Sequence, residues 1–138
     1  MKKTVPSLVL ALFLFPSIAK GVTVKFDDLV KLEGLHYYKF TGEPFTGKVT
    51  GKTQGSFKNG KRYGAWVIYH DNGQLGSKGT FKDGKRDGAW VIYYDNGQLL
   101  IKGTYKDGKK NGPWVGYKKD GTVEGYFTGT YKNGVKVK

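Results

Sequence analysis

Two kinds of short segment, distinguished by their pattern of apolar and polar residues, recur along the chain. The first kind alternates apolar or small residues with polar ones, as a half-buried β-strand does, and it occupies residues 75–82 and 99–106. The second kind is rich in β-branched and aromatic residues and is too short for a typical helix; it occupies residues 65–70, 89–94 and, more weakly, 113–118. The pattern therefore predicts pairs of β-strands.

These segments belong to a repeat. The row of 24 residues that begins at Gly55 is identical at 18 positions to the row that begins at Gly79. A third row from Gly103 has 26 residues, and a truncated fourth begins at Gly129. Self-similarity at a period of roughly 20–50 residues marks a repeat architecture. We therefore predict an all-β fold, an open antiparallel β-meander built from hairpin repeats of about 24 residues.

Asparagine–glycine and aspartate–glycine pairs separate the predicted strands. We predict type I′ hairpin turns at Asn72-Gly73 and Asn96-Gly97, because both central residues of that turn need a positive φ. In the third row Gly121-Thr122 is expected to form a type II′ turn, which places Lys119 opposite Glu124. The alternate connections carry Asn59-Gly60, Asp83-Gly84, Asp107-Gly108 and Asn133-Gly134.

The predicted turns also set the pairing of tryptophan with glycine. A two-residue turn brings the tryptophan of each row opposite the glycine that opens the next row. We expect the indole ring to cover backbone that the facing glycine leaves bare. The predicted structural pairs are Trp66 with Gly79, Trp90 with Gly103, and Trp114 with Gly129.

The part of the chain before the repeats lacks the period. Glu33-Gly34 is predicted to turn a hairpin between residues 29–32 and 35–40, and a short helix over residues 28–32 is the alternative. Terminal repeats are expected to be atypical, because they close an otherwise exposed sheet edge.

The first 19 residues have the pattern of an export signal. A positively charged start precedes an apolar run over residues 5–18, and the small residues Ser17 and Ala19 occupy the positions that a signal peptidase reads. The run is shorter than the ~20 apolar residues of a membrane span. We predict cleavage between Ala19 and Lys20, no transmembrane span in the mature chain, and a periplasmic or extracellular location. The expected division is a signal peptide at 1–19, an amino-terminal cap at 20–54, and repeats at 55–78, 79–102, 103–128 and, in part, 129–138.

Each row combines a Gly-Ala-Trp triplet, a tyrosine, an Asn-Gly turn and a Gly-Thr-Phe-Lys segment that ends in Asp-Gly-Lys. These elements first occur at residues 64–66, Tyr69, 72–75 and 79–85. They resemble the MORN repeat in its bacterial variant, over roughly residues 55–138. The resemblance implies a fold of successive hairpins and no catalytic residues. Family members include eukaryotic scaffold and membrane-junction proteins and bacterial YwqK-type antitoxins, which are partners of secreted toxins.

The residues that carry catalysis or bind metals are sparse. The absence of cysteine excludes disulfides, thiolate metal sites and cysteine nucleophiles. His36 has no second ligand at a suitable spacing, and His70 is interpreted as a surface residue at a strand end. Most carboxylates lie in turns, where aspartate stabilises the local backbone. We therefore expect no enzyme activity, no bound metal and no cofactor.

Charge is the remaining functional signal. The chain has 24 Lys and Arg residues against 11 Asp and Glu, a formal net charge of +13. Nine basic residues recur at the turns along one margin of the predicted meander, about 10 Å apart from row to row. This margin comprises Lys58, Lys61, Arg62, Lys82, Lys85, Arg86, Lys106, Lys109 and Lys110.

Two interpretations of the margin remain open, a solvated surface that keeps the protein soluble and a binding strip for an anionic partner. We predict an exported, non-enzymatic module that binds another macromolecule, either a protein or an anionic component of the cell envelope. An antitoxin that neutralises a partner toxin, and an envelope scaffold that binds anionic lipid, are the alternatives. Nucleic acid fits the charge but not an exported location, so we do not expect it as a partner.

Overall fold

The computed structural model describes residues 21–138. The predicted signal peptide and its cleavage site at Ala19 and Lys20 lie outside these residues. Within the described part of the chain, no helix is long and apolar enough to cross a membrane.

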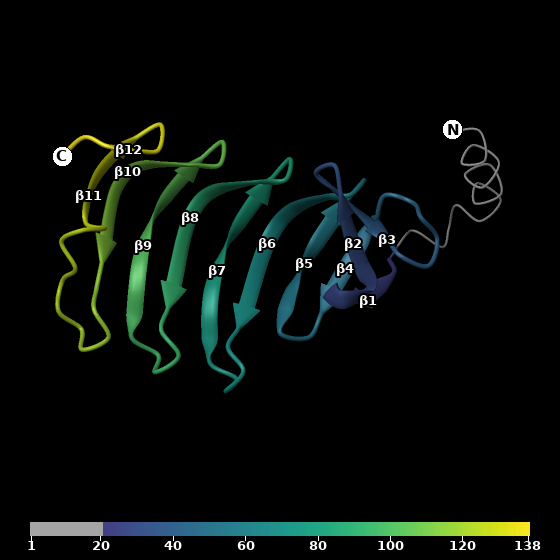
Figure 1. Ribbon diagram of the computed structural model, residues 1–138, viewed down its shortest axis with the longest axis horizontal. Helices are drawn as coiled ribbons and strands as arrows, with labels where there is room; N and C mark the ends of the chain where they lie inside the picture. Colours follow the sequence, from purple (N-terminus) through teal and green to yellow (C-terminus); the bar gives the residue numbers. More distant parts are fainter. Residues whose placement is uncertain (1–20) are drawn as a thin grey trace.

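One long sheet of ten strands forms most of the described chain, with the strand order β1-β4-β5-β6-β7-β8-β9-β10-β11-β12. Successive hairpins follow one another along the long axis, which confirms the predicted all-β antiparallel meander (Figure 1). The strands from β4 onward are β4 Gly47–Thr50, β5 Thr53–Lys58, β6 Lys61–Tyr69, β7 Leu75–Lys82, β8 Lys85–Tyr93, β9 Leu99–Lys106, β10 Lys109–Gly116, β11 Gly129–Lys132 and β12 Val135–Lys136.

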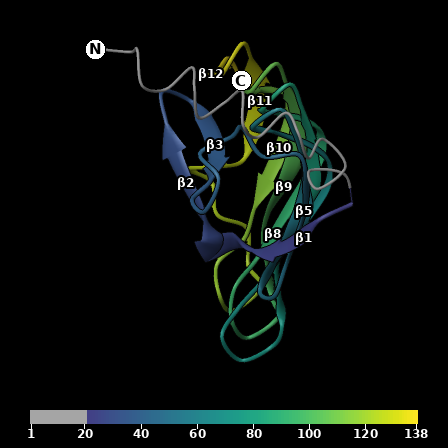
Figure 2. The same ribbon diagram turned by 90° about the vertical axis from the view of Figure 1, so that its right-hand side faces the viewer.

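The segment before β4 is built differently. Strand β1 (Thr23–Lys25) runs parallel to β4, and a single 3₁₀ turn, η2 (Phe26–Asp28), leads into a separate hairpin of β2 (Leu29–Leu32) and β3 (Leu35–Tyr38). This hairpin lies beside one face of the long sheet (Figure 2). The predicted Glu33-Gly34 hairpin is thus confirmed, and the alternative helix over 28–32 does not form.

Strands β6, β8 and β10 begin earlier in the sequence than we predicted. We expected them to begin at residues 65, 89 and 113, but they begin at Lys61, Lys85 and Lys109. Glycines with positive φ, such as Gly64 (φ 70°), lie within these strands as β-bulges. The sequence pattern made them look like strand boundaries, because glycine interrupts the run of β-branched residues.

The type I′ turns lie at the opposite edge of the sheet from the one predicted. Asn72 does not have a positive φ, and only Gly73 does (φ 86°). The Gly73 N–H donates to the His70 carbonyl (2.9 Å) and the His70 N–H to the Gln74 carbonyl (2.8 Å), so three residues form this loop. The loop at Asn96-Gly97 is the same. Type I′ geometry, with both φ angles positive, occurs instead at Asn59-Gly60, Asp83-Gly84, Asp107-Gly108 and Asn133-Gly134.

The predicted register is nevertheless correct, because two one-residue changes compensate. The three-residue loop pairs Tyr69 with Leu75, and a bulge at Gly76 then shifts the pairing by one residue. Beyond the bulge Trp66 lies opposite Gly79, as predicted. A bulge at Leu100 has the same effect in the next row. The other two register pairs, Trp90 with Gly103 and Trp114 with Gly129, are also found.

The prediction of a type II′ turn at Gly121-Thr122 in the third row was wrong. The Lys118 N–H donates to the Thr122 carbonyl (2.7 Å), so residues 119–121 form the same three-residue loop as in the earlier rows. Lys119 therefore lies within the loop and does not face Glu124, whose N–H donates to the Gly116 carbonyl (2.8 Å). The asparagine of the other rows is replaced here by Asp120, which accepts a hydrogen bond from the Thr122 N–H in the same way (2.9 Å).

The tryptophan rings cover different glycines from those predicted. A Cβ placed on Gly79 would collide with the Trp90 indole, and one on Gly103 would collide with Trp114; Trp66 covers Gly55 in the same way. The register places the three residues Gly88–Trp90 opposite the single Gly79, and this bulge directs the indole toward the preceding strand. Each tryptophan therefore pairs in register with the following glycine and covers the preceding one.

The core is a row of aromatic rings on the same face as the tryptophans. Adjacent ring centroids are 5.0–6.5 Å apart, mostly in edge-to-face contact, and Trp66 and Trp114 are each only 1% exposed. Each such pair contributes about 0.5–1.5 kcal/mol beyond the area it buries. The row runs through Phe57, Trp66, Phe81, Trp90, Tyr105, Trp114 and Tyr131.

Candidate binding surface

Six of the nine predicted basic residues form one regular surface, which we call the lysine margin. They flank the type I′ turns as cross-strand pairs at one edge of the sheet, the upper edge in Figure 1. Two strands separate successive pairs, so the pairs repeat about every 10 Å. The pairs are Lys58 with Lys61, Lys82 with Lys85, and Lys106 with Lys109.

The backbone beneath the lysine margin is held in place by its neighbours. The N–H of Gly84 donates to the Arg62 carbonyl (3.0 Å), and that of Gly108 to the Arg86 carbonyl (2.9 Å). The stem of Lys61 lies against the next turn, because a Cβ on Gly84 would contact its Cγ at 3.7 Å. Each hairpin turn is thus bonded to the one before it, and the lysines are presented on a rigid edge.

No ion pair neutralises the lysine margin within the described part of the chain. The two ion pairs found among residues 21–138, Lys52–Asp71 and Lys119–Asp95, both lie at the opposite edge of the sheet. Asp83 is the nearest acid in sequence to the middle pair and sits in its turn, but it forms no ion pair with either lysine. The ammonium groups are therefore accessible to an external anion.

Sequence reasoning missed further lysines on the same face. Residues two apart on a strand share a face. Lys78 and Lys82 therefore lie on one face of β7, and Lys102 and Lys106 on one face of β9. Both Lys78 and Lys102 are exposed. The period-2 alternation of these strands predicts this placement, whereas the recurrence of basic residues near the turns does not.

The remaining three residues of the predicted margin lie on the other face. Arg62 pairs with Phe57, Arg86 with Phe81, and Lys110 with Tyr105, one residue inward from the lysine pairs. Because side chains alternate along a strand, this single step moves them to the aromatic face. The prediction that all nine cations form one strip was wrong for this reason.

These three cations are stacked on the tryptophans. The guanidinium carbon of Arg62 lies 4.8 Å from the Trp66 ring centroid, and that of Arg86 lies 4.9 Å from the Trp90 centroid. Lys110 Nζ lies 4.7 Å from the Trp114 centroid. Burial lowers the pKa of Arg62, and the like charge of Arg86 lowers it further. Arginine nevertheless stays charged at neutral pH, so these contacts are cation–π interactions.

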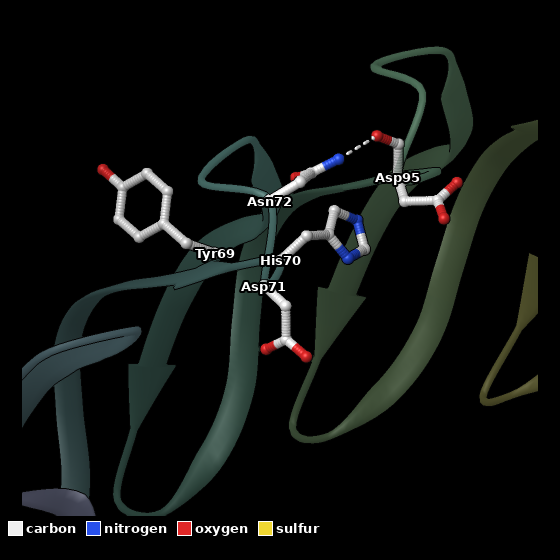
Figure 3. A pocket seen from close by; sticks show the side chains of 5 residues that line it. All are labelled: Tyr69, His70, Asp71, Asn72 and Asp95. Atoms are coloured by element: carbon white, nitrogen blue, oxygen red, sulfur yellow. Dashed lines mark hydrogen bonds between the residues drawn. The ribbon is translucent and has the colours of Figure 1, made fainter.

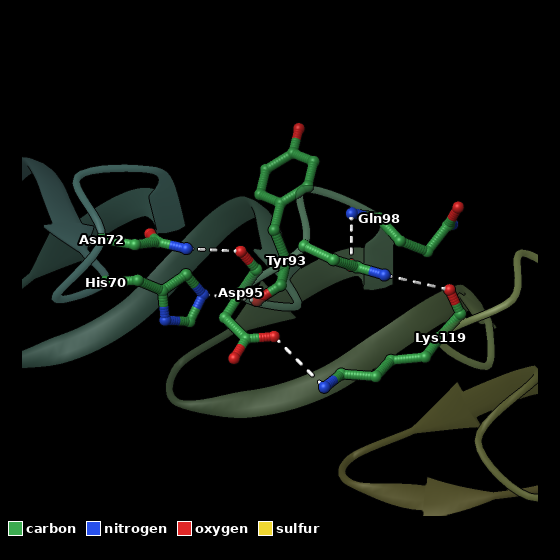
Figure 4. A network of polar contacts seen from close by, with 7 residues as sticks. His70, Asn72, Tyr93, Asp95, Gln98 and Lys119 are labelled. Atoms are coloured by element: carbon green, nitrogen blue, oxygen red, sulfur yellow. Dashed lines mark hydrogen bonds and ion pairs between the residues drawn. The ribbon is translucent and has the colours of Figure 1, made fainter.

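The opposite edge of the sheet carries a network that joins one loop to the next. Asn72 Nδ2 donates to the Asp95 carbonyl (2.7 Å), and His70 Nε2 is 2.9 Å from the Tyr93 carbonyl (Figure 4). One row later, Asn96 Nδ2 and the Tyr94 hydroxyl make the equivalent bonds. His70 directly follows the last residue of β6, at the strand end where we predicted it, and its ring also bridges two hairpins.

The carboxylates at this edge are also engaged. A hydrogen bond from Lys52 lowers the pKa of Asp71, and one from Lys119 lowers the pKa of Asp95. A polar hollow of about 430 Å³ opens between these loops and is lined by Tyr69, His70, Asp71, Asn72 and Asp95 (Figure 3). Its polar side chains mainly hold adjacent loops together. Residues 21–138 contain no cluster of three or more metal-ligating side chains.

His36 is buried in the amino-terminal part of the chain. Its ring centroid lies 4.7 Å from that of Phe57 and 5.9 Å from that of Phe26. Burial lowers its pKa below the ordinary value of 6.5, and the charge of Arg62 acts in the same direction. His36 is therefore a packed core residue.

The comparisons with known proteins agree with the repeat seen in the structure. The family model of the MORN repeat variant matches residues 62–83 and 86–107. Each match begins at the cation stacked on a tryptophan and covers that tryptophan, the following loop and the next strand. No curated protein matches the chain.

Proposed function

We propose that the chain is an exported, non-enzymatic module that binds an acidic partner protein. Two of its segments match the MORN repeat variant, and MORN repeats are generally protein- or lipid-binding modules. The lysine margin is the contact surface in this proposal. Binding takes place in the periplasm or at the cell envelope, where the signal-peptide pattern directs the chain.

One observation supports this proposal more than any other. Three lysine pairs stand about 10 Å apart on a rigid edge, and the ion pairs found in residues 21–138 leave them free. A single exposed contact contributes at most about 1 kcal/mol. Once the first pair is engaged, however, the second and third contacts become intramolecular, so an extended acidic surface binds far more tightly than a small anion.

The test compares two variants that lose equal charge. Lys61, Lys85 and Lys109 are replaced together by Gln. In the control, Lys25, Lys39 and Lys118, which are all exposed and lie outside the margin, are replaced by Gln. Affinity for poly-L-glutamate is measured by isothermal titration calorimetry. The margin variant should lose about 10- to 30-fold and the control about twofold or less. Equal losses would show that only net charge matters and would overturn the proposed site.

A second arm of the same experiment uses vesicles of neutral lipid with and without phosphatidylglycerol. If the partner is an acidic protein, the chain should bind polyglutamate. Binding to the anionic vesicles alone, with no measurable affinity for polyglutamate, would replace the proposed function by that of a lipid-binding scaffold.

A further inference from the structure

The three cations of the aromatic face differ in how many rings surround them. Arg62 lies over three rings, those of Phe26, Trp66 and Phe81, at 4.8–5.3 Å. Lys110 likewise lies over three, those of Trp114, Phe127 and Tyr131, at 4.7–5.8 Å. Arg86, in the middle row, lies over only two, those of Trp90 and Tyr105, at 4.9 and 5.3 Å.

The third ring at each end comes from outside the regular repeat. Phe26 belongs to η2, and its ring meets that of Trp66 edge-on at 6.4 Å. Phe127 belongs to the connection between β10 and β11, which is longer than those between earlier rows. The middle row has no such extra element, so the position beside Arg86 that corresponds to Phe26 is open.

The first two rows make this a controlled comparison, because they are identical at 18 of 24 positions. Arg62 is partly buried, and its Nε is shielded from solvent. Arg86 is exposed, and one of its guanidinium nitrogens donates to the Tyr105 hydroxyl (3.2 Å). The ion pairs found within residues 21–138 do not include Arg86. Two features therefore distinguish the two arginines. The amino-terminal segment adds the Phe26 ring over Arg62, and Arg86 lies over Tyr105, where Arg62 lies over Phe81.

We propose that the open position over Arg86 and Trp90 binds an aromatic side chain flanked by carboxylates, presented by an extended segment of the partner protein. The ring completes the set of three around the cation, and a neighbouring carboxylate binds the guanidinium donors that remain free. In the chain's own segment Phe26 supplies the ring over Arg62. Asp27 and Asp28 follow it directly in sequence, and the ion pairs found within residues 21–138 include neither of them. This inference rests on the proposed function in that it takes the partner to be an acidic protein.

The test uses nuclear magnetic resonance of the full mature chain. The three indole N–H groups serve as local reporters, since each donates to a different carbonyl: Trp66 to Tyr63, Trp90 to Thr80, and Trp114 to Thr104. The probe is the capped hexapeptide Gly-Asp-Phe-Asp-Asp-Gly. Its titration should shift the Trp90 indole resonance and leave the Trp66 and Trp114 resonances close to their positions in the free protein.

Two exposed cations provide the matched variants. Arg86→Gln removes the cation on the aromatic face, and Lys118→Gln removes a cation outside both the aromatic face and the lysine margin. Arg86→Gln should weaken peptide binding by about fivefold or more, and Lys118→Gln by about twofold or less. The peptide with Ala in place of Phe should not shift Trp90, and this control needs no change to the protein.

The result separates the inference from the proposed function. If the peptide shifts no indole while polyglutamate still binds the lysine margin, the site over Arg86 is wrong and the proposed function stands. If both peptides bind equally, or if Lys118→Gln weakens binding as much as Arg86→Gln does, the contact is nonspecific charge attraction and the inference is also overturned. If the peptide binds as expected and polyglutamate does not, the inference stands and the lysine margin is not the main contact surface.

Discussion

The indole of Trp90 lies directly over Gly79, the glycine of the preceding strand, and leaves no room there for a side chain. The backbone of Trp90 pairs in register with Gly103 on the following strand. One residue of β8 therefore couples β7 and β9, and the same arrangement recurs at Trp66 and Trp114. Through these contacts each hairpin is stabilised by its neighbours, as repeat architectures require.

We expect Gly79→Ala to be strongly destabilising. The added methyl group would overlap the buried Trp90 ring, and overpacking of this kind costs about 1–3 kcal/mol. Gly125→Ala is the control, because nothing lies within 4 Å of a Cβ at that position and its φ is not positive. Urea unfolding of both variants gives the comparison.

A double variant tests whether the Trp90 ring causes the cost of Gly79→Ala. In a Trp90→Ala background, which itself costs about 3–5 kcal/mol, the penalty of Gly79→Ala should largely disappear. If that penalty stays the same without the indole, the ring does not cover Gly79.

Stability should depend on pH through His36. Burial lowers its pKa in the folded protein below the 6.5 of an unperturbed histidine. As the pH decreases, the unfolded chain therefore binds a proton at a higher pH than the folded protein does. The contribution of His36 to the free energy of unfolding is fully present above pH 6.5 and falls below it, by at most about 1.4 kcal/mol per pH unit. Melting temperatures between pH 7.5 and 5 should show this decrease.

His36→Phe should remove most of this pH dependence, because Phe packs among the same aromatic rings without titrating. His70→Tyr, which copies the residue found one row later, should keep it. A decrease that survives His36→Phe unchanged would assign it to another group.

The two edges of the sheet should respond differently to one substitution. Asn133 has a positive φ (50°) in a type I′ turn, so Asn133→Gly should be neutral or slightly stabilising. Asn72 lacks a positive φ, and its side chain binds both Asp95 and Gln74, so Asn72→Gly should cost about 1–2 kcal/mol. Thermal unfolding distinguishes them. Equal effects would mean that the bonds between loops contribute nothing.

Export is tested by the mass of the protein recovered from its natural compartment. The small residues Ser17 and Ala19 occupy the positions that a signal peptidase reads, so we predict that the mature chain begins at Lys20. Mass spectrometry of the periplasmic fraction and of the medium shows which terminus is present. A product that keeps Met1, whether in the cytoplasm or in the membrane, would contradict the proposed location.

The register could be predicted from the sequence even though the turn was not. Asn72-Gly73 indicated the correct pairing of Trp66 with Gly79, because the longer loop and the bulge at Gly76 change the register by one residue in opposite directions. Bulges leave little signal in a sequence, since any small or apolar residue can occupy them: Gly76 in one row corresponds to Leu100 in the next.

The division of the basic residues between two faces can be derived from the sequence once the first residue of each strand is known. Lys85 and Arg86 are adjacent, and strand alternation alone separates their side chains once β8 is known to begin at Lys85. The third ring over Arg62 could not be predicted in this way. Phe26 lies outside the repeat, and its contact with Arg62 depends on how η2 folds back over the sheet.

The lysine margin is proposed to bind its partner as an array. Its most direct test is the affinity for poly-L-glutamate after removal of one, two and three lysine pairs, in the order Lys82 with Lys85, then Lys106 with Lys109, then Lys58 with Lys61, each lysine replaced by Gln. We expect every removed pair to lower the affinity by a similar factor, and the dependence of affinity on salt to become less steep at each step. An affinity that falls only with one pair, or that does not depend on salt, would contradict this proposal.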